Sequence, residues 1–431
     1  MHITIKSRYA QSKSCRGWYF VGKVTVLAPL YFKNFECIGS SCEDTCCKDW
    51  SISIDKKTYE KYRKIDEIAK KSKKTKFSPL AGGHITRHIL KNKKKDTFEN
   101  HYAQLNLVDG FCPFLDENHL CGIYKELGPQ NMSRKCKIYP RSLTRFGSEY
   151  EISLTVSCPE VVRKALLNKD FMAFEYIETD SEIIEFVNFD FDEKAPEHKY
   201  LWDIRTNAIT ILQARKFDIV NRLILLGMMY EKIQKCIDEN AYESIPDTIN
   251  DFMSVIDVTG NSAFSKLKGN FEIQNTIYKS IFDGEFVNLY KSYKKIFYDE
   301  YMLPALRVID ENDETGYNDL KKIYSKYTKG EYSYILENYL VNEYFRTLMP
   351  FGKFVTLRDG LIKLCSDYTF IQGIALGFIN QNADLNIDEL VKIIYMFGRN
   401  FVHNQFYNKI VKANIKKWEL DTLGGLYTLI F

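Results

Sequence analysis

Eight of the eleven cysteines in this chain lie between residues 37 and 158, and this clustering constrains the fold more than any other feature of the sequence. The stretch FECIGSSCEDTCCKDW, residues 35–50, holds four of them. Gly, Pro, Ser and Asp surround most of the eight, so we expect them on turns and loops, which can bend several thiolates toward one centre. The clustered cysteines are Cys37, Cys42, Cys46, Cys47, Cys112, Cys121, Cys136 and Cys158.

Such a cluster indicates either a disulfide framework or a metal site. The first residues, MHITIKSRYAQSKSCRGWYFVG, lack the apolar core and small-residue cleavage site of a secretory signal. Apolar stretches such as LILLGMM at 223–229 fall well short of the roughly 18–20 residues that span a bilayer. We therefore expect a cytoplasmic protein without a membrane segment, in which thiols stay reduced and bind metal.

The spacing of the cysteines does not decide which metal they bind. Zinc and iron–sulfur clusters, including the 4Fe-4S type, both take four thiolates. Typical zinc modules use paired C-x-x-C knuckles, which this sequence lacks. Eight cysteines can supply two four-coordinate centres, or one centre with thiols to spare. Cys46 and Cys47 leave consecutive Cα atoms in different directions, so we expect one ion to be held rarely by both.

Five other residues with metal-ligand chemistry are interpreted differently. Cys15, Cys236 and Cys365 stand alone in the sequence, as small buried apolar residues commonly do. His84 and His88 have the i, i+4 spacing of one helix face, but no acidic partner accompanies them. We interpret this histidine pair as part of the surface or of a basic patch.

Composition and charge limit the class of protein. The chain is 45% hydrophobic and 27% charged, which is typical of a globular protein, and 431 residues give room for two or three cores. The net charge of +4 does not indicate a nucleic-acid binder. Residues 56–95 carry 15 Lys and Arg against 3 Asp and Glu, but few aromatic residues and no nucleic-acid motif. We interpret this segment as a solvated face with a loop at 72–83; docking of an acidic protein is the alternative.

The second half of the chain has helical periodicity. Apolar residues recur at helical spacing in 201–211 and again in 219–233. Pro246 is expected in the first turn of one helix, and Asn386 is a plausible cap for the helix that contains LVKIIYMF. Alternation in EISLTVSC and IIEFVNFDF indicates a short strand or two within 150–195.

These patterns predict a mainly α protein. We expect a leader at 1–23 and a loop-rich, Cys-ligated metal module with little strand at 24–195. An all-α helical domain at 196–431 follows.

Three segments carry a family resemblance: LAPLYFKNFECIGSSCEDTCCKDWSISIDKKTYEKY, FCPFLDENHLCGIYKELGPQNMSRKCKIYPR and SLTVSCPEVVR. They resemble the bacterial flagellin lysine-N-methylase family, within a broader group that has a CxxCxxCC-type zinc- or iron-chelating domain. The resemblance is dense from Leu27 to Arg163 and continues through KYLWDIRTNAITILQ and LILLGM to FGRNFVHN. Relatives commonly begin near Val24 or Val26, so we interpret residues 1–23 as a disordered tail or a mispredicted start.

The resemblance implies methylation of flagellin lysines, with S-adenosylmethionine as donor and an iron–sulfur cluster. The sequence does not show where the donor binds, because it has no Gly-rich turn of the GxGxxG kind. The radical-enzyme pattern CxxxCxxC is half matched by Cys42 and Cys46, but Asp49 stands where its third cysteine would be. A metal that is structural, that binds the donor, or that does redox work is compatible with this pattern.

Polar residues beside the cysteines are the candidates for proton transfer. Tyr139, Asp49 and Glu160 are weak candidates for a catalytic base, and Asp44 and Arg141 are also expected near the metal. Residues in such positions more often hydrogen-bond to the ligands.

Two functions therefore remain open. One is a methylase that transfers the methyl group at the metal module and recognises flagellin with its helical half. The other is a non-enzymatic zinc or iron–sulfur scaffold, or a redox sensor, that binds a protein partner.

Overall fold

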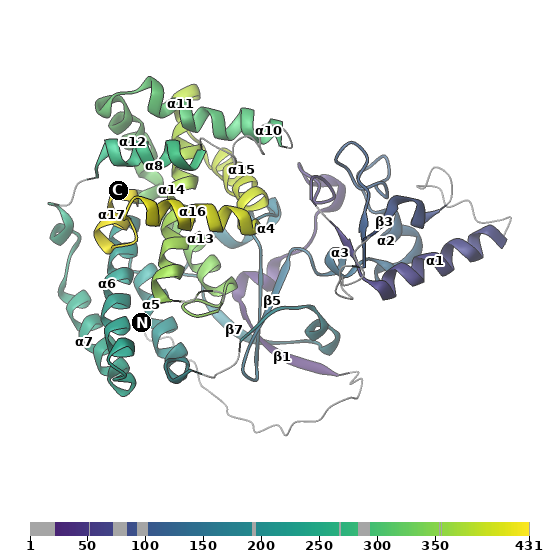
Figure 1. Ribbon diagram of the computed structural model, residues 1–431, viewed down its shortest axis with the longest axis horizontal. Coiled ribbons are helices and arrows are strands. Elements are labelled where there is room, and N and C mark those ends of the chain that lie inside the picture. Colours follow the sequence, from purple (N-terminus) through teal and green to yellow (C-terminus); the bar gives the residue numbers. More distant parts are fainter. Residues whose placement is uncertain are drawn as a thin grey trace. The chain divides into compact units, whose positions relative to one another are not determined.

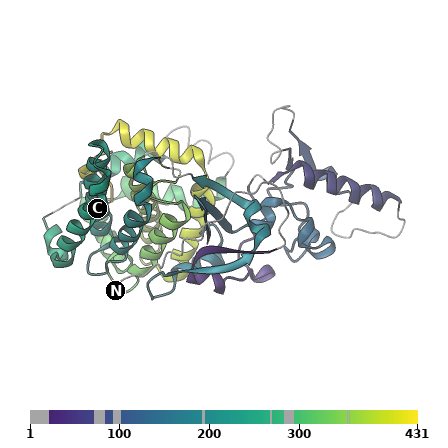
Figure 2. The same ribbon diagram turned by 90° about the horizontal axis from the view of Figure 1, so that it is seen from below.

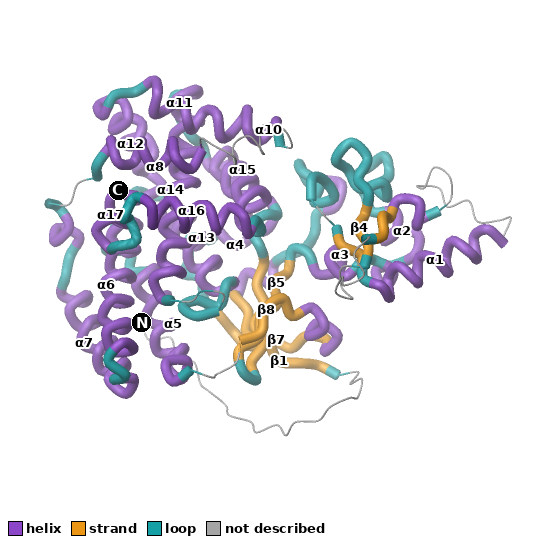
Figure 3. Tube along the Cα trace, viewed as in Figure 1, coloured by secondary structure: helices purple, strands orange, loops and turns teal. Residues whose placement is uncertain are grey.

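The computed structural model describes residues 22–50, 52–71, 84–92, 102–191, 195–266, 269–282, 294–352, 354 and 356–430. Figure 3 shows a mostly helical chain with small sheets in its N-terminal part, which confirms the predicted fold class. The expected leader lies almost wholly outside the described residues. Within these ranges, none of the helices has the length and apolar character needed to cross a membrane.

Contacts between residues divide the chain into two compact units. The cysteine unit comprises residues 35–142 and 158–160, and the helical unit comprises residues 1–34, 143–157 and 161–431. The metal module predicted at 24–195 is wider than the cysteine unit. The difference arises because the strands on both sides of the cysteine unit form a sheet that belongs with the helices.

The helical unit contains a five-stranded sheet with the strand order β7-β1-β6-β5-β8. Its first strand, β1, pairs antiparallel with β7 and parallel with β6, with Val26 opposite Tyr150. Val26, Leu143 and Ile152 are among the residues of its small apolar core. The strands are β1 (Lys23–Pro29), β5 (Arg141–Phe146), β6 (Glu149–Leu154), β7 (Phe174–Asp180) and β8 (Val187–Phe191). The strands predicted within EISLTVSC and IIEFVNFDF correspond to β6 and β8.

The rest of the helical unit is built from helices, several of which are labelled in Figure 1. Those that precede residue 300 are α4 (Pro159–Leu166), α5 (Leu201–Leu212), α6 (Ile219–Asp238), α7 (Ile245–Val258), α8 (Phe271–Phe282) and α10 (Lys295–Phe297). Those that follow are α11 (Leu303–Glu311), α12 (Glu314–Thr328), α13 (Ser333–Arg346), α14 (Leu357–Asn382), α15 (Ile387–Phe397), α16 (Gln405–Lys417) and α17 (Leu423–Ile430). Two π-helical turns, η10 (Tyr298–Met302) and η11 (Gly398–Val402), interrupt the series.

Helix α14 is the centre of this unit. It contacts α6, α11, α12, α13, α15 and α17, and most of its side chains are buried. Gly377 allows α11 to approach closely, because a Cβ there would lie 2.6 Å from the backbone nitrogen of Ala305 on α11. A larger residue at Gly377 would therefore push the two helices apart.

The helical patterns read from the sequence are confirmed. Both apolar stripes are buried, one on α5 and the other on α6. Pro246 lies in the first turn of α7. The side chain of Asn386 accepts a hydrogen bond of 2.9 Å from the backbone N–H of Glu389, which caps α15 as expected.

The cysteine unit has little regular structure of its own. A three-stranded sheet in the order β2-β4-β3 consists of β2 (Ser53–Ile54), β3 (Ile89–Lys91) and β4 (Ala103–Leu105). Its helices are α1 (Lys56–Lys71), the long purple helix in Figure 2, α2 (Gly122–Leu127) and α3 (Arg134–Ile138). Buried Asp66 ties α1 to the short 3-10 turn at 85–88 by accepting hydrogen bonds from the N–H groups of Ile85 and Thr86.

The basic segment and the histidine pair lie in this part of the chain. Of the segment 56–95, helix α1 and residues 84–92 are described, and the expected loop at 72–83 lies outside the described residues. His84 and His88 do not share an α-helix, because His84 precedes and His88 ends the 3-10 turn Ile85–His88. Both are half-buried, and the ring of His88 packs edge-on against Phe114 at 5.8 Å.

Candidate functional site

Five of the eight clustered thiols lie within electrostatic range of one another: those of Cys46, Cys47, Cys112, Cys121 and Cys136. Local backbone geometry brings them together. The N–H of Cys112 donates to the carbonyl oxygen of Cys47 at 2.8 Å, Cys121 is the residue before α2, and Cys136 lies on α3. All except Cys46 pack against the same small apolar core.

Hydrogen-bond donors surround these sulfur atoms. The N–H of Phe114 interacts with the Cys112 thiol, and N–H groups from the first turn of α2 interact with the Cys121 thiol. The hydroxyl of Ser133 does the same for Cys136. Donors aimed at sulfur are typical of thiolates that bind a metal or an iron–sulfur cluster.

Burial sets the protonation of these thiols in the absence of metal. It raises the pKa of Cys112 to about 12 and that of Cys136 to about 11. The pKa of Cys47 is raised above its ordinary value by a hydrogen bond with the Cys46 thiol and by burial. The two adjacent thiols therefore interact with each other, and whether one ion is held by both stays a prediction.

The donor set fits a four-thiolate group. It contains five candidate sulfur ligands from four segments of the chain, with N–H groups directed at two of them, and no nitrogen or carboxylate ligand is required. Among the described residues, no group of three or more His, Cys, Asp or Glu side chains already has the geometry of a metal site. A metal would thus replace thiol protons and draw the sulfur atoms into place.

The other three predicted ligands have different surroundings. Cys37 is exposed, and its charge raises the pKa of Arg141, which burial lowers by a larger amount. The thiol of Cys42 donates to the carbonyl oxygen of Asp44 at 3.0 Å. Cys158 is half-buried and directly precedes α4.

Two of the weak catalytic candidates belong to the cysteine unit's framework. The ring of Tyr139 packs against Trp50 at 5.6 Å, just after α3. Asp49 has a positive φ of 58°, and its carboxylate occupies the space where a side chain at Gly110 would project. Asp49 therefore packs against a position, Gly110, that has no room for a side chain.

The remaining polar candidates are also placed. Buried Asp44 forms an ion pair of 2.7 Å with Lys48. The guanidinium of Arg141 lies over the ring of Phe35. Glu160 is buried in the first turn of α4.

A second group of polar side chains, in the helical unit, was not found by sequence reasoning. Glu343 and Arg346 on α13 form a buried ion pair, and Lys363 and Tyr339 both hydrogen-bond to Asp367 on α14. Burial raises the pKa of Glu343, but the charge and hydrogen bonds of Arg346, together with the charges of Lys363 and His403, lower it by more, and the net pKa is lowered. The sequence pattern of a helix does not distinguish a buried charged residue from an exposed one. Their burial becomes evident only once the packing of the helices is known.

Next to this group, the C-terminal end of β6 meets the π-helical turn η11. Nε2 of His403 lies 3.1 Å from Oγ1 of Thr155 and 3.3 Å from Oγ of Ser157. Nε of Arg399 donates to the carbonyl oxygen of Ser157 at 3.0 Å. Arg399 and His403 belong to the segment FGRNFVHN.

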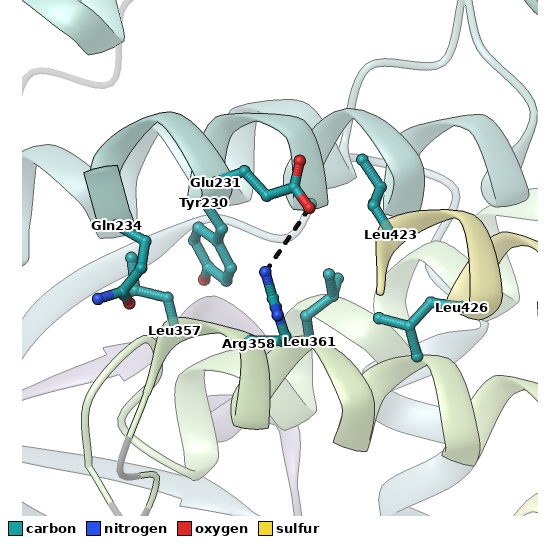
Figure 4. Close-up of a pocket in the computed structure, with 9 residues that line it drawn as sticks. Tyr230, Glu231, Gln234, Leu357, Arg358, Leu361, Leu423 and Leu426 are labelled. Carbon is teal, nitrogen blue, oxygen red and sulfur yellow. Dashed lines mark ion pairs between the residues drawn. The ribbon is translucent and has the colours of Figure 1, made fainter. Parts of the chain in front are cut away.

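Figure 4 shows a small hollow between α6, α14 and α17 of the helical unit. Glu231 and Arg358 form an ion pair of 3.8 Å across it, and leucines make up much of its lining. The hydroxyl of Tyr230 hydrogen-bonds to that of Tyr344 at 2.7 Å. The hollow therefore offers one solvent-exposed ion pair and apolar walls, which is not a site for proton transfer.

Comparison with known proteins gives two family matches. Residues 205–429 match the family described as the FliB lysine N-methylase C-terminal domain. Residues 36–159, which nearly coincide with the cysteine unit, match a domain described as zinc- or iron-chelating, CxxCxxCC.

Individual relatives agree with these matches. Proteins named lysine-N-methylase from Salmonella choleraesuis and Salmonella typhimurium are each 25% identical over 398 residues, which cover 89% of this chain and 93% of the relative. A flagellar biosynthetic protein, FliU of Salmonella muenchen, is 36% identical over 153 residues, which cover 35% of this chain and 82% of that protein. No solved structure matches the chain.

Proposed function

The chain belongs to the FliB lysine N-methylase family, and from this premise we propose that it methylates lysine side chains of flagellin with S-adenosylmethionine as donor. The observation that carries the proposal is the joint match of a chelating domain and a lysine N-methylase C-terminal domain in one chain. Relatives named lysine-N-methylase align over nearly their whole length. The name of the flagellar relative supports flagellin as the substrate.

The proposed reaction is a direct displacement. The lysine ammonium, with an ordinary pKa of about 10.4, first loses a proton to become a nucleophile. Its nitrogen lone pair then forms a bond to the sulfonium methyl carbon, while the C–S bond breaks and its electron pair stays on sulfur. The products are methyl-lysine and a neutral thioether. Such a step needs in-line geometry and a site without bulk water.

We further propose that Cys47, Cys112, Cys121 and Cys136 hold one four-thiolate centre, of the iron–sulfur kind. Their shared core and the donors aimed at their sulfur atoms support this choice among the eight candidates. When bound, such a centre would cross-link the loops of the cysteine unit. Protein purified without oxygen should be brown and contain iron and acid-labile sulfide. Stoichiometric zinc without sulfide would contradict the iron–sulfur assignment.

The helical unit is proposed to recognise flagellin. Its many amphipathic helices offer the grooves and faces that protein partners commonly use. The basic face of α1 in the cysteine unit would add charge steering, which salt weakens.

Intact mass of flagellin tests the proposed reaction. Flagellin from cells with the protein should show added mass in steps of one methylene, and flagellin from cells without it should not. Cells that carry Cys112→Ser should resemble the deletion, and cells that carry Cys236→Ser should resemble wild type. A protein that holds metal but leaves the mass of flagellin unchanged would instead support the scaffold function.

A further inference from the structure

Two tyrosine rings and the amine of Lys91 meet in the cysteine unit. Nζ of Lys91 lies 4.8 Å from the centre of the Tyr59 ring and 5.7 Å from the centre of the Tyr102 ring. The two ring centres are 5.3 Å apart, and the ring planes are inclined by 58°. The rings therefore form a corner, which we call the tyrosine corner. One ammonium group lies over both of them, within the distance of about 6 Å at which aromatic faces attract cations.

Local structure fixes the two walls of the tyrosine corner. Tyr59 lies in the first turn of α1, and its N–H donates to the carbonyl oxygen of Asp55 at 2.9 Å. Tyr102 directly precedes β4, and its carbonyl oxygen accepts a hydrogen bond of 3.1 Å from the N–H of Asn92. Tyr59 is part of the apolar core of the cysteine unit, and Tyr102 packs against that core. Both tyrosines are therefore anchored in packed structure, as the walls of a preformed binding site need to be.

Lys91 belongs to the same framework, but its side chain is exposed. It lies on β3 opposite Ala103 of β4, which places it beside Tyr102. Interaction with Tyr59, and then with Tyr102, raises the pKa of Lys91 above its ordinary value. The tyrosine corner thus favours the charged form of a lysine side chain.

This preference separates the tyrosine corner from the site of methyl transfer. The proposed displacement needs a neutral amine, because the nitrogen lone pair forms the new bond. A methylated lysine, in contrast, keeps its positive charge at neutral pH. The unmodified ammonium is strongly hydrated, and methyl groups lower the cost of removing the cation from water. Aromatic walls therefore suit methylated lysine better than unmodified lysine.

We propose that the tyrosine corner is a binding site for a methylated lysine side chain of the protein substrate, and that Lys91 occupies it in the free protein. The site would bind the product rather than the reacting amine, and would retain a substrate that has further lysines to be methylated. The inference rests on the proposed function for the origin of the methylated lysine. Lys91 is a tethered competitor, which keeps the affinity of the site low until a more suitable cation displaces it.

Binding of short synthetic peptides to the full-length protein tests this inference. One peptide carries trimethyl-lysine, the second carries unmodified lysine at the same position, and the third carries a neutral isostere with a tert-butyl group in place of the trimethylammonium group. Ligand-observed NMR titrations would give each dissociation constant for wild type, for Lys91→Ala, and for Lys91→Ala combined with Tyr102→Leu. The matched control is Lys199→Ala, because the structure describes one ring beneath the Lys199 amine, that of Tyr200 at 5.2 Å.

We expect the trimethyl-lysine peptide to bind Lys91→Ala about three- to sixfold more tightly than wild type, because the competing amine is gone. Lys91→Ala should bind this peptide at least about threefold more tightly than the other two peptides, since neither of them carries a methylated cation. Adding Tyr102→Leu should remove that difference, and Lys199→Ala should equal wild type. If the double variant proves unfolded by circular dichroism, the three peptides on Lys91→Ala decide the question.

Two results would overturn the inference. Equal affinity of wild type and Lys91→Ala for the trimethyl-lysine peptide would show that Lys91 does not occupy a binding site. Equal affinity of Lys91→Ala for the charged peptide and its neutral isostere would show apolar contact instead of recognition of a cation. Failure of the proposed function looks different, because these peptides are already methylated. Tight peptide binding together with flagellin of unchanged mass would contradict the proposed reaction alone.

Discussion

Arg205 on α5 donates two hydrogen bonds, of 2.7 and 2.8 Å, to the carboxylate of Glu151 on β6, and each side chain is only 1% exposed. This pair connects the five-stranded sheet to the helices that follow it. The same guanidinium also donates to the carbonyl oxygen of Phe345 at 3.0 Å. Burial raises the pKa of Glu151 even with Arg205 beside it, so the carboxylate depends on this partner to remain charged.

Removing the cation should therefore destabilise the helical unit. We expect Arg205→Met to lower the free energy of unfolding by about 3–5 kcal/mol, because it leaves Glu151 buried without a partner. A double variant with Glu151→Leu should recover most of that loss. The matched control is Lys199→Ala, which breaks an exposed pair with Glu243 and should lower the free energy of unfolding far less. Urea unfolding followed by circular dichroism measures all three, and equal losses in the single variants would contradict the prediction.

The thiols should divide into two classes by their effect on metal content. Cys112→Ser is expected to lower metal per chain and the yield of folded protein, since the loops of the cysteine unit depend on the metal for their order. Cys236→Ser, at a half-buried thiol on α6 that contacts Thr248, should leave the metal unchanged. Metal analysis of the purified variants decides the matter. Similar metal loss in both would show that the clustered and single cysteines do not differ in role.

Lys321 on α12 makes stability depend on pH. Burial lowers the pKa of Lys321 to about 8, whereas the unfolded chain keeps this proton up to about pH 10.4. Between these values the unfolded state binds more protons, so the free energy of unfolding rises with pH. Below about pH 8 the charged amine is a cost, and we expect Lys321→Met to be more stable than wild type by roughly 1–3 kcal/mol at pH 7.

That advantage should shrink as the pH approaches about 10, because wild-type Lys321 is then neutral as well. Urea titrations at several pH values measure it. Lys322→Met, at an exposed neighbour on the same helix, is the control and should show no such trend. A constant difference between Lys321→Met and wild type across this range would rule out the proposed cause.

A fragment of residues 24–195 should be unstable. Sequence reasoning places a domain boundary at residue 195. Truncation at residue 195 would separate β6 from its partners Arg205 and Asn342. It would also remove the contacts that Arg399 and His403 make with residues 155–157. We therefore expect the fragment to be aggregation-prone and to hold metal less tightly than the full chain. Gel filtration and metal analysis test this, and a monomeric, fully loaded fragment would support the earlier boundary.

Local features of this fold are readable from the sequence, because helices bury stripes of fixed period. Leu201 and Ile204 on α5 and Leu223 on α6 are buried as their spacing predicts. Asn386 caps α15 because its side chain accepts a hydrogen bond from the backbone N–H of Glu389. The two residues are close in the sequence, so the local pattern is enough to predict the cap. The sequence also predicts that Cys112, Cys121 and Cys136 bind metal, and this stays a prediction.

Long-range pairings could not be predicted in the same way. Val26 pairs with Tyr150, and His403 contacts Ser157, across separations that no periodic signal records. The polar side chains around Glu343 and Asp367 look in the sequence like the exposed polar residues of any helix. Their burial depends on how α13 and α14 pack. The parallel strand pair and the contact between His403 and Ser157 therefore emerge only from the assembled fold.

The place where the cysteine unit is inserted has a consequence for biosynthesis. Strand β1 is made first, but both of its partners, β6 and β7, are made only after residues 35–142 of the cysteine unit. Until then β1 has an unpaired edge, the kind of surface that attracts other chains. If the cysteine unit has already collapsed around its metal, β1 and β6 have less flexible chain to close between them. We therefore expect metal supply to act as a quality-control step during synthesis, with metal-starved cells accumulating the protein in inclusion bodies.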